Sequence, residues 1–257
     1  MSGLLTLLGK EIREILRTSR IYVIPGLFLF FGLTSPILTK LMPELLKSFG
    51  GSAGGIEIVI PPRTAVDSFT QFFKNLTQVG ILAVILTTMG AVADEKTRGT
   101  VLLVVTKPVA RVSVVVAKFL AGVLVVVFGT ALGYVAALYY TIQLFPGVPV
   151  AASLRAATVF AVYVVFIVAL TVWASTVMRG QVAAAGVALA GFVTAGILPS
   201  LSPVLARWTP GGLVGLTGRM FAANASLGDA GATIAVSLVV SLLLVAAAGW
   251  SLGRQEL

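Results

Sequence analysis

Six long apolar stretches alternate along the chain with connecting segments that carry almost all of its charged residues. They cover residues 21–41, 76–93, 112–140, 157–178, 182–200 and 231–252. Each is close to the roughly 20 residues that an α-helix needs to cross the hydrocarbon core of a bilayer. Because lipid cannot satisfy backbone polar groups, helices are the expected spanning form. The pattern predicts an all-α integral membrane protein with six transmembrane helices in one domain, residues 1–257.

The first 20 residues predict an amphipathic helix. Apolar residues recur there at helical spacing and share one face, while charged residues fall on another. The apolar set is Leu4, Leu5, Leu8, Ile12, Ile15 and Leu16, and the charged set is Lys10, Arg13, Glu14 and Arg17. A helix with these two faces is expected to lie in the membrane interface. Packing on another subunit is the alternative.

The composition excludes a soluble fold. Only 11% of the 257 residues are charged and 58% are hydrophobic, whereas soluble domains carry roughly 25% charged residues. The net charge of +9 would suggest nucleic acid for a soluble protein. In a membrane protein it indicates positive cytoplasmic loops and anionic lipid. We therefore expect the lipid bilayer, and not nucleic acid, as a partner.

The distribution of positive charge predicts the orientation. With the N-terminus inside, the cytoplasmic segments hold eleven of the 18 Lys and Arg residues. The outer segments hold the other seven in a longer total length of chain. Positive residues are denser on the cytoplasmic side of membrane proteins. Both termini are therefore expected to be cytoplasmic.

The segment before the last apolar stretch, residues 201–230, is too apolar for a plain loop and too interrupted for a span. Pro203, Pro210, Gly211 and Gly212 break it. It predicts short helices that dip into the outer leaflet, with an ordinary interfacial loop as the alternative. On the same side, residues 66–74 form an amphipathic stretch before the second span.

Several kinds of chemistry have no residues to support them. The chain contains no His or Cys, which removes the commonest general base and the thiolate ligands of metals. It also lacks the G-x-x-x-x-G-K-[ST] phosphate loop. We expect no catalytic residue, no metal and no cofactor in this chain, and no ATP hydrolysis by it.

No carboxylate is predicted in the middle of the membrane. Ion-coupled carriers normally keep an ionisable group at that depth, which disfavours the alternative of a secondary transporter or channel not driven by ATP. The sequence supports an intramembrane enzyme even less, because His and Cys are both missing. Hydroxyl groups are the polar groups predicted at depth, and the candidates for lining a pathway are Thr87, Thr88 and Thr194.

The densest motif starts at Asp94, in the sequence DEKTRGTVLLVVTKPVARVSVVVAKFLAG. Its apolar piece, residues 100–105, is too short to cross a bilayer. Pro108 pushes the preceding Lys107 out of helical geometry. The chain is therefore expected to form one short helix along the membrane surface, covered by lipid headgroups or a cytoplasmic partner. It would then re-enter near Lys118, whose ammonium group is expected to snorkel toward the interface.

The spacing Glu95-x3-Gly99-Thr100-x5-Thr106-x-Pro108-x2-Arg111-x6-Lys118 resembles that of ABC-2-type exporter permeases (type V fold), between the same two spans. The amphipathic N-terminal helix, the six spans and the broken outer segment are also similar. The resemblance implies a permease subunit in the cytoplasmic (inner) membrane of a prokaryote. It implies a homodimer, or a pseudo-dimer with a second permease. Separate ABC ATPase subunits would bind ATP and Mg.

The resemblance also implies residue roles. The short surface helix would be the coupling helix that docks on the ATPase, and the second and fifth spans would flank a central pathway. The implied coupling residues are Glu95, Arg98, Gly99, Thr100, Leu102, Leu103, Val105, Thr106, Pro108, Arg111 and Lys118.

Small residues suggest where helices approach one another closely. In the fifth span, the candidates for the dimer interface are Ala183, Gly186, Ala190 and Gly191. Gly129-x-x-x-Gly133 also matches the small-residue packing motif, but a chance match is expected in a chain with 27 glycines.

Overall fold

The computed structural model describes residues 2–18, 20–50, 62–97, 111–222 and 225–254. Every regular element in these ranges is a helix. Six helical runs in them are long and apolar enough to cross a membrane: Tyr22–Leu45, Ala65–Thr97, Val112–Leu144, Val150–Val177, Gln181–Leu201 and Leu227–Arg254. The prediction of an all-α membrane protein with six spans is confirmed.

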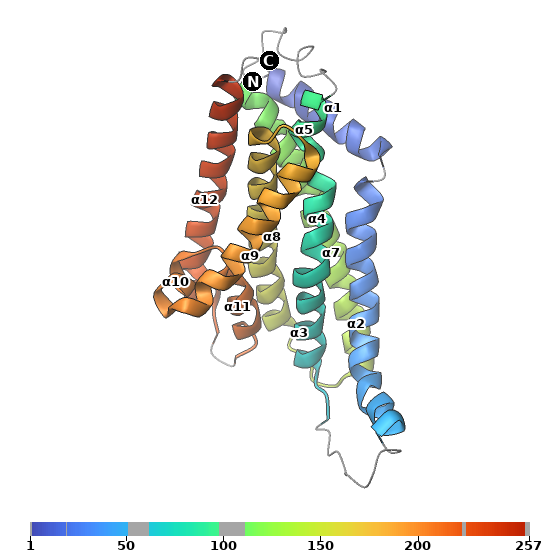
Figure 1. Ribbon diagram of the computed structural model, residues 1–257. Helices are drawn as coiled ribbons and strands as arrows, with labels where there is room; N and C mark the ends of the chain where they lie inside the picture. Colours follow the sequence, from blue (N-terminus) through green and yellow to red (C-terminus); the bar gives the residue numbers. More distant parts are fainter. Residues whose placement is uncertain (1, 19, 51–61, 98–110, 223–224, 255–257) are drawn as a thin grey trace.

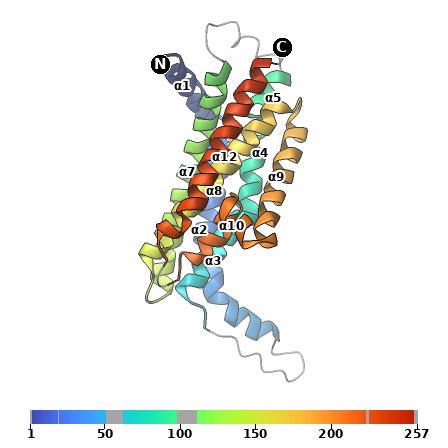
Figure 2. The same ribbon diagram turned by 90° about the vertical axis from the view of Figure 1, so that its left-hand side faces the viewer.

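The spans run side by side, and the N-terminal helix lies across one end of the bundle (Figure 1, Figure 2). This helix, α1 (Ser2–Arg17), lies at the end where α12 (Leu227–Arg254) finishes. Because the number of spans is even, the chain enters the first span and leaves the last span at the same end of the bundle. We call this end the α1 end and the opposite one the far end. The helix predicted for residues 1–20 is present, and its place in the membrane interface stays a prediction.

The central helix of the bundle is α8 (Val150–Val177). It packs against α7 (Arg111–Leu144), α9 (Gln181–Leu201) and α12. Of its apolar window, 72% is buried, against 22% for α9 and 28% for α12. Aromatic and branched side chains on α8 supply much of the core, because large side chains bury the most apolar surface. The helices α9 and α12 are therefore peripheral and leave broad faces open.

Glycines let α2 (Arg20–Gly50) pack closely against α7. A Cβ atom on Gly32 would lie 2.3 Å from the carbonyl oxygen of Gly133, and one on Gly133 would lie 2.6 Å from that of Phe28. A Cβ atom on Gly129 would lie 3.3 Å from the backbone of Pro25. The Gly129-x-x-x-Gly133 pattern is thus a packing surface within the chain, and treating it as a chance match is wrong.

The second span is one helical run in four pieces. They are α3 (Ala65–Asn75), the π-helical turn η1 (Leu76–Gly80), α4 (Ile81–Thr88) and α5 (Gly90–Thr97). A capping box starts the run: Thr64 Oγ1 accepts from the Asp67 N–H, and Asp67 Oδ2 accepts from the Thr64 N–H. Because this box starts the helix at Ala65, the amphipathic stretch at residues 66–74 is continuous with the span, which begins well before residue 76.

Two short helices interrupt the segment before the last span, as predicted: α10 (Pro203–Trp208) and α11 (Gly212–Arg219). The turn between them is tight. A Cβ atom on Gly211 would lie 1.7 Å from the Ala195 carbonyl oxygen, and one on Gly212 would lie 1.8 Å from that of Ala206. Only glycine allows this close return onto α9. The depth of these helices in a leaflet stays a prediction.

Candidate coupling site at the α1 end

Three helices meet through a buried lysine at the α1 end. Lys118 Nζ on α7 lies 2.9 Å from Glu95 Oε1 on α5 and 3.1 Å from Glu11 Oε2 on α1. Only 4% of the Lys118 side chain is exposed. Burying a charge costs several kcal/mol unless ion pairs and hydrogen bonds compensate. Here both carboxylates provide that compensation, so Lys118 holds the three helices together.

Lys10 and Glu14 of α1 complete the cluster on its exposed side. Lys10 Nζ lies 3.1 Å from Glu11 Oε1 and 3.2 Å from both Glu14 Oε2 and Glu95 Oε1. Partial burial lowers the pKa of Lys10, but the carboxylates of Glu11, Glu95 and Glu14 outweigh it and raise that pKa above its ordinary value. Lys10 therefore stays charged at neutral pH. We call Lys10, Glu11, Glu14, Glu95 and Lys118 the charge cluster.

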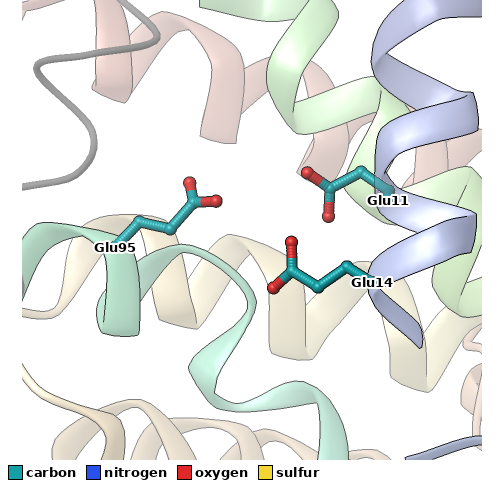
Figure 3. A group of neighbouring side chains, drawn as sticks. All are labelled: Glu11, Glu14 and Glu95. Carbon is teal, nitrogen blue, oxygen red and sulfur yellow. The ribbon is translucent and has the colours of Figure 1, made fainter. Parts of the chain in front are cut away.

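The three carboxyl groups of the charge cluster face one another between α1 and α5 (Figure 3). Ligand oxygens of Glu11, Glu14 and Glu95 lie within 4.8 Å of one another. Three carboxylates could in principle hold a divalent cation. The ammonium groups of Lys118 and Lys10 already contact these carboxylates. The arrangement is therefore explained as a set of charge-assisted bonds that join helices.

The prediction that Lys118 snorkels is wrong. Its side chain points into the protein because α1 packs over the start of α7 and supplies Glu11, a partner 107 residues away in the sequence. Glu11 lies one helical turn from both Leu8 and Ile15, on the apolar face of α1. A carboxylate on an apolar face was the signal that could have indicated a buried partner.

The helix α5 is also bound to α8. Ser175 Oγ accepts the backbone N–H groups of Val92 and Ala93, each at 3.0 Å. These N–H groups are near the start of α5, where a helix leaves them without an intrahelical acceptor. Lys96 Nζ donates to the carbonyl oxygen of Thr176. The last described helix before residues 98–110 is thus fixed to α1, α7 and α8 together.

The comparisons with known proteins agree with this architecture. The family model described as "ABC-2 family transporter protein" matches residues 5–211, most of the chain. The chain belongs to the ABC-2 transporter family. It is thus an ABC-2 permease. Members of this family are membrane subunits that are not themselves ATPases, and they typically pair with an ABC ATPase subunit.

One curated relative of this permease is the uncharacterized transmembrane protein YxlG of Bacillus subtilis (strain 168). The two are 27% identical over 168 residues, which is 65% of this chain and 65% of the relative. The match therefore spans slightly less than two thirds of the relative's length. The name of this relative describes a transmembrane protein and states no activity.

Among the coupling residues expected of this ABC-2 permease, the structure brings Glu95 and Lys118 into contact. Arg111 is the first residue of α7. Eight others lie outside the described residues, and their role stays a prediction: Arg98, Gly99, Thr100, Leu102, Leu103, Val105, Thr106 and Pro108. Sequence reasoning did not find Glu11 as an ion-pair partner or Ser175 as a cap.

The pathway candidates of the permease fall in two places. Thr87 and Thr88 line a cavity of about 50 Å³ beside the charge cluster, which is room for about one or two water molecules. Their hydroxyl groups donate to carbonyl groups within α4. Thr194 is exposed on α9 and donates to the Ala190 carbonyl oxygen. One chain does not bring the three hydroxyls together, and a pathway role stays a prediction.

The dimer-interface candidates of the permease divide between two faces of α9. Ala183, Gly186 and Ala190 are exposed, and a Cβ atom on Gly186 would meet nothing within 4 Å. Gly191 faces the other way, because a Cβ atom there would lie 2.9 Å from the Leu170 side chain on α8. The first three therefore form an open strip of small residues, whereas Gly191 packs within its own chain.

Proposed function

We propose that this chain is the transmembrane permease subunit of an ATP-driven exporter. In this account a separate nucleotide-binding subunit hydrolyses ATP with Mg²⁺, and this chain moves a substrate out across the cytoplasmic membrane of a prokaryote. The observation that supports the proposal is the position of the charge cluster. Glu95 lies in the last turn of α5, directly before residues 98–110, and Lys118 ties it to α1 and α7.

Export requires that movement at the ATPase reaches the spans. In the proposal, residues 98–110 dock on the ATPase, so α5 and α7 receive the movement first because they flank this segment. The Glu95–Lys118 ion pair joins the two helices, and Glu11 adds α1 to the same unit. Ser175 passes displacement of α5 on to α8, the central helix of the bundle. The charge cluster then acts as a rigid junction between the ATPase and the spans.

The placement of acidic groups favours ATP over an ion gradient as the energy source. Among the described residues, every Asp and Glu lies near one of the two ends of the bundle: Glu11, Glu14, Glu44, Asp67, Asp94, Glu95 and Asp229. A proton- or cation-coupled carrier usually places such a group at mid-membrane. The described part of the spans offers hydroxyl groups there instead.

The open strip of α9 supports a proposed dimer. Ala183, Gly186 and Ala190 would meet the same strip of a second copy, or a second permease, across a two-fold axis. Small residues allow close backbone approach between membrane helices. In this arrangement the pathway would run between the second and fifth spans of the two permeases.

Co-purification tests the proposal. A tagged chain is expressed with nucleotide-binding proteins encoded by neighbouring genes, and the detergent-purified material is assayed for composition and ATP hydrolysis. We expect a complex with equal numbers of the two subunits that hydrolyses ATP, and a permease that does not when purified alone. Absence of any nucleotide-binding partner, together with ion flux through liposomes containing the chain alone, would instead support a secondary transporter or channel.

A further inference from the structure

A large cavity opens between the short helices α10 and α11 and the far-end halves of α8, α9 and α12. Its volume is about 1020 Å³, at the upper end of the range for small-molecule sites, about 300–1,000 Å³. Its wall includes Arg207 of α10 and Arg219 of α11 at the far end. It also includes Tyr163 and Phe192, which lie halfway along α8 and α9. The cavity thus reaches from the end of the bundle to mid-depth. We call it the far-end cavity.

The charged residues in the wall of the far-end cavity give it a net positive charge. Among the described residues, neither Arg207 nor Arg219 forms an ion pair with a carboxylate. Asp229 also lines the wall, but its carboxylate accepts the Ser226 N–H at 2.7 Å and the Ser226 hydroxyl at 3.0 Å. That acid caps α12 and forms no ion pair with either arginine, so two positive charges face one negative charge in the wall. An anionic group beside these arginines would gain charge-assisted hydrogen bonds.

A third arginine lies next to this region with incomplete bonding. Arg155 of α8 has a buried Nε that finds no hydrogen-bond partner in the described part of the chain. Its one contact to the end of α11 is long, 3.5 Å from Nη2 to the Met220 carbonyl oxygen. Buried polar groups are normally satisfied. The guanidinium group of Arg155 therefore places a further positive charge beside the end of α11.

The inner end of the cavity has a largely apolar lining. Tyr163 has no exposed surface, and its hydroxyl has no hydrogen-bond partner among the described residues. The wall beside it is largely apolar, with Phe192, Val214 and Leu216. That hydroxyl has no surface accessible from the cavity, so a bound molecule meets a largely apolar wall there.

We propose that the far-end cavity binds a phospholipid with an anionic headgroup. The headgroup phosphate contacts Arg207 and Arg219 at the far end, and one acyl chain runs inward along Phe192 and Leu216. The cavity is charged at the end of the bundle and apolar at mid-depth, which is the polarity of a lipid in one leaflet. A soluble anion would leave the apolar half unfilled. The proposal does not depend on ATP-driven export.

Lipid binding by the purified full-length chain in neutral detergent tests this proposal. Phosphatidylglycerol is compared with phosphatidylcholine of the same acyl chains and with glycerol 3-phosphate, using native mass spectrometry and the lipid-induced shift in melting temperature. We expect phosphatidylglycerol to bind about tenfold more tightly than phosphatidylcholine, because both lipids carry the phosphate but the choline cation of phosphatidylcholine would lie beside two arginines. Glycerol 3-phosphate should bind weakly. Equal binding of the two lipids, or of glycerol 3-phosphate and phosphatidylglycerol, would overturn the proposal.

Charge variants locate the headgroup. Arg207→Gln together with Arg219→Gln should abolish the preference for phosphatidylglycerol. Arg63→Gln, an exposed far-end arginine outside the cavity wall, is the matched control and should retain it. Full preference in the double arginine variant, or equal loss in Arg63→Gln, would contradict the site.

Filling the cavity provides an independent test. A Cβ atom on Gly196, which lines the cavity, meets nothing within 4 Å. Gly196→Leu should fold normally and reduce phosphatidylglycerol binding by about tenfold, whereas Gly26→Leu, with equally open space on α2, should not. If Gly196→Leu separates dimers while lipid binding persists, the cavity accommodates a second copy of the chain and the lipid proposal is wrong.

Discussion

Lys118 Nζ lies 2.9 Å from Glu95 Oε1, although 23 positions separate the two residues in the sequence. The segment between them includes residues 98–110, where the ABC-2 resemblance places the coupling helix. A single buried ion pair therefore joins α5 and α7, the two helices that flank that segment. Because the same ammonium group also holds Glu11, a force on the segment reaches α1, α5 and α7 at one point.

Replacing Lys118 should destabilise the protein strongly. Lys118→Met leaves two carboxylates without their buried partner, and breaking a buried ion pair on one side typically costs about 3–5 kcal/mol. The expected result is a clear drop in melting temperature in detergent, measured by intrinsic tryptophan fluorescence.

Lys10 is the matched control because 47% of its side chain is exposed. Lys10→Met should cost only about 0–1 kcal/mol. Combining Glu11→Gln and Glu95→Gln with Lys118→Met should recover part of the loss by removing the unpaired charges. Similar melting temperatures for Lys118→Met and Lys10→Met would show that the pairing contributes little.

Gly133 should tolerate no side chain. A Cβ atom there would lie 2.6 Å from the Phe28 carbonyl oxygen, so Gly133→Val must separate α2 from α7. Overpacking of this kind costs about 1–3 kcal/mol. On α2, Gly26→Ala meets nothing within 4 Å and should be neutral or slightly stabilising. Melting temperatures of the two variants provide the comparison, and equal values would contradict the packing seen here.

The sequence predicted the six spans because hydrophobicity at helical length is a local property. It placed helix ends less well. The second span starts at Ala65, where the Thr64–Asp67 capping box begins the helix. The sequence predicted a start at residue 76, because the amphipathic stretch before it is less apolar than a typical span. The helix α8 starts at Val150 and includes Arg155. The sequence predicted a start after Arg155, because a charged residue usually marks the end of an apolar stretch.

The charge cluster could be predicted only in part. The family motif indicated Glu95 and Lys118, but the partners Glu11 and Ser175 come from other helices, and no local spacing connects them. Their contacts depend on how α1 and α8 pack. The same limit applied to Gly133, whose close neighbour Gly32 belongs to a helix about 100 residues earlier in the sequence.

The membrane orientation can be tested because the chain contains no cysteine. Ser226 is exposed at the far end and Thr97 at the α1 end. Ser226→Cys should react with an impermeant thiol reagent added to intact cells, and Thr97→Cys only after permeabilisation, as the positive-inside rule requires. The reverse labelling pattern would invert the topology.

The proposed dimer predicts a cross-linking pattern along α9. Cysteines at Gly186 and Ala190, on the open strip, should form cross-links between copies under mild oxidation. A cysteine at Gly191 should not, because that position faces Leu170 in its own chain. Non-reducing gels give the answer, and dimers that form through another span and never through Gly186 or Ala190 would place the two-fold axis elsewhere.

The central claim is that the charge cluster transmits ATPase motion, and stimulation of ATP hydrolysis tests it most directly. The rate of the nucleotide-binding subunit is measured alone and with the permease in liposomes, for the wild type, Glu95→Gln and Glu14→Gln. Glu14 is the control because it belongs to the cluster but does not contact Lys118. We predict that Glu95→Gln still binds the ATPase but loses most of the stimulation, while Glu14→Gln keeps it. Wild-type stimulation by Glu95→Gln would contradict the account.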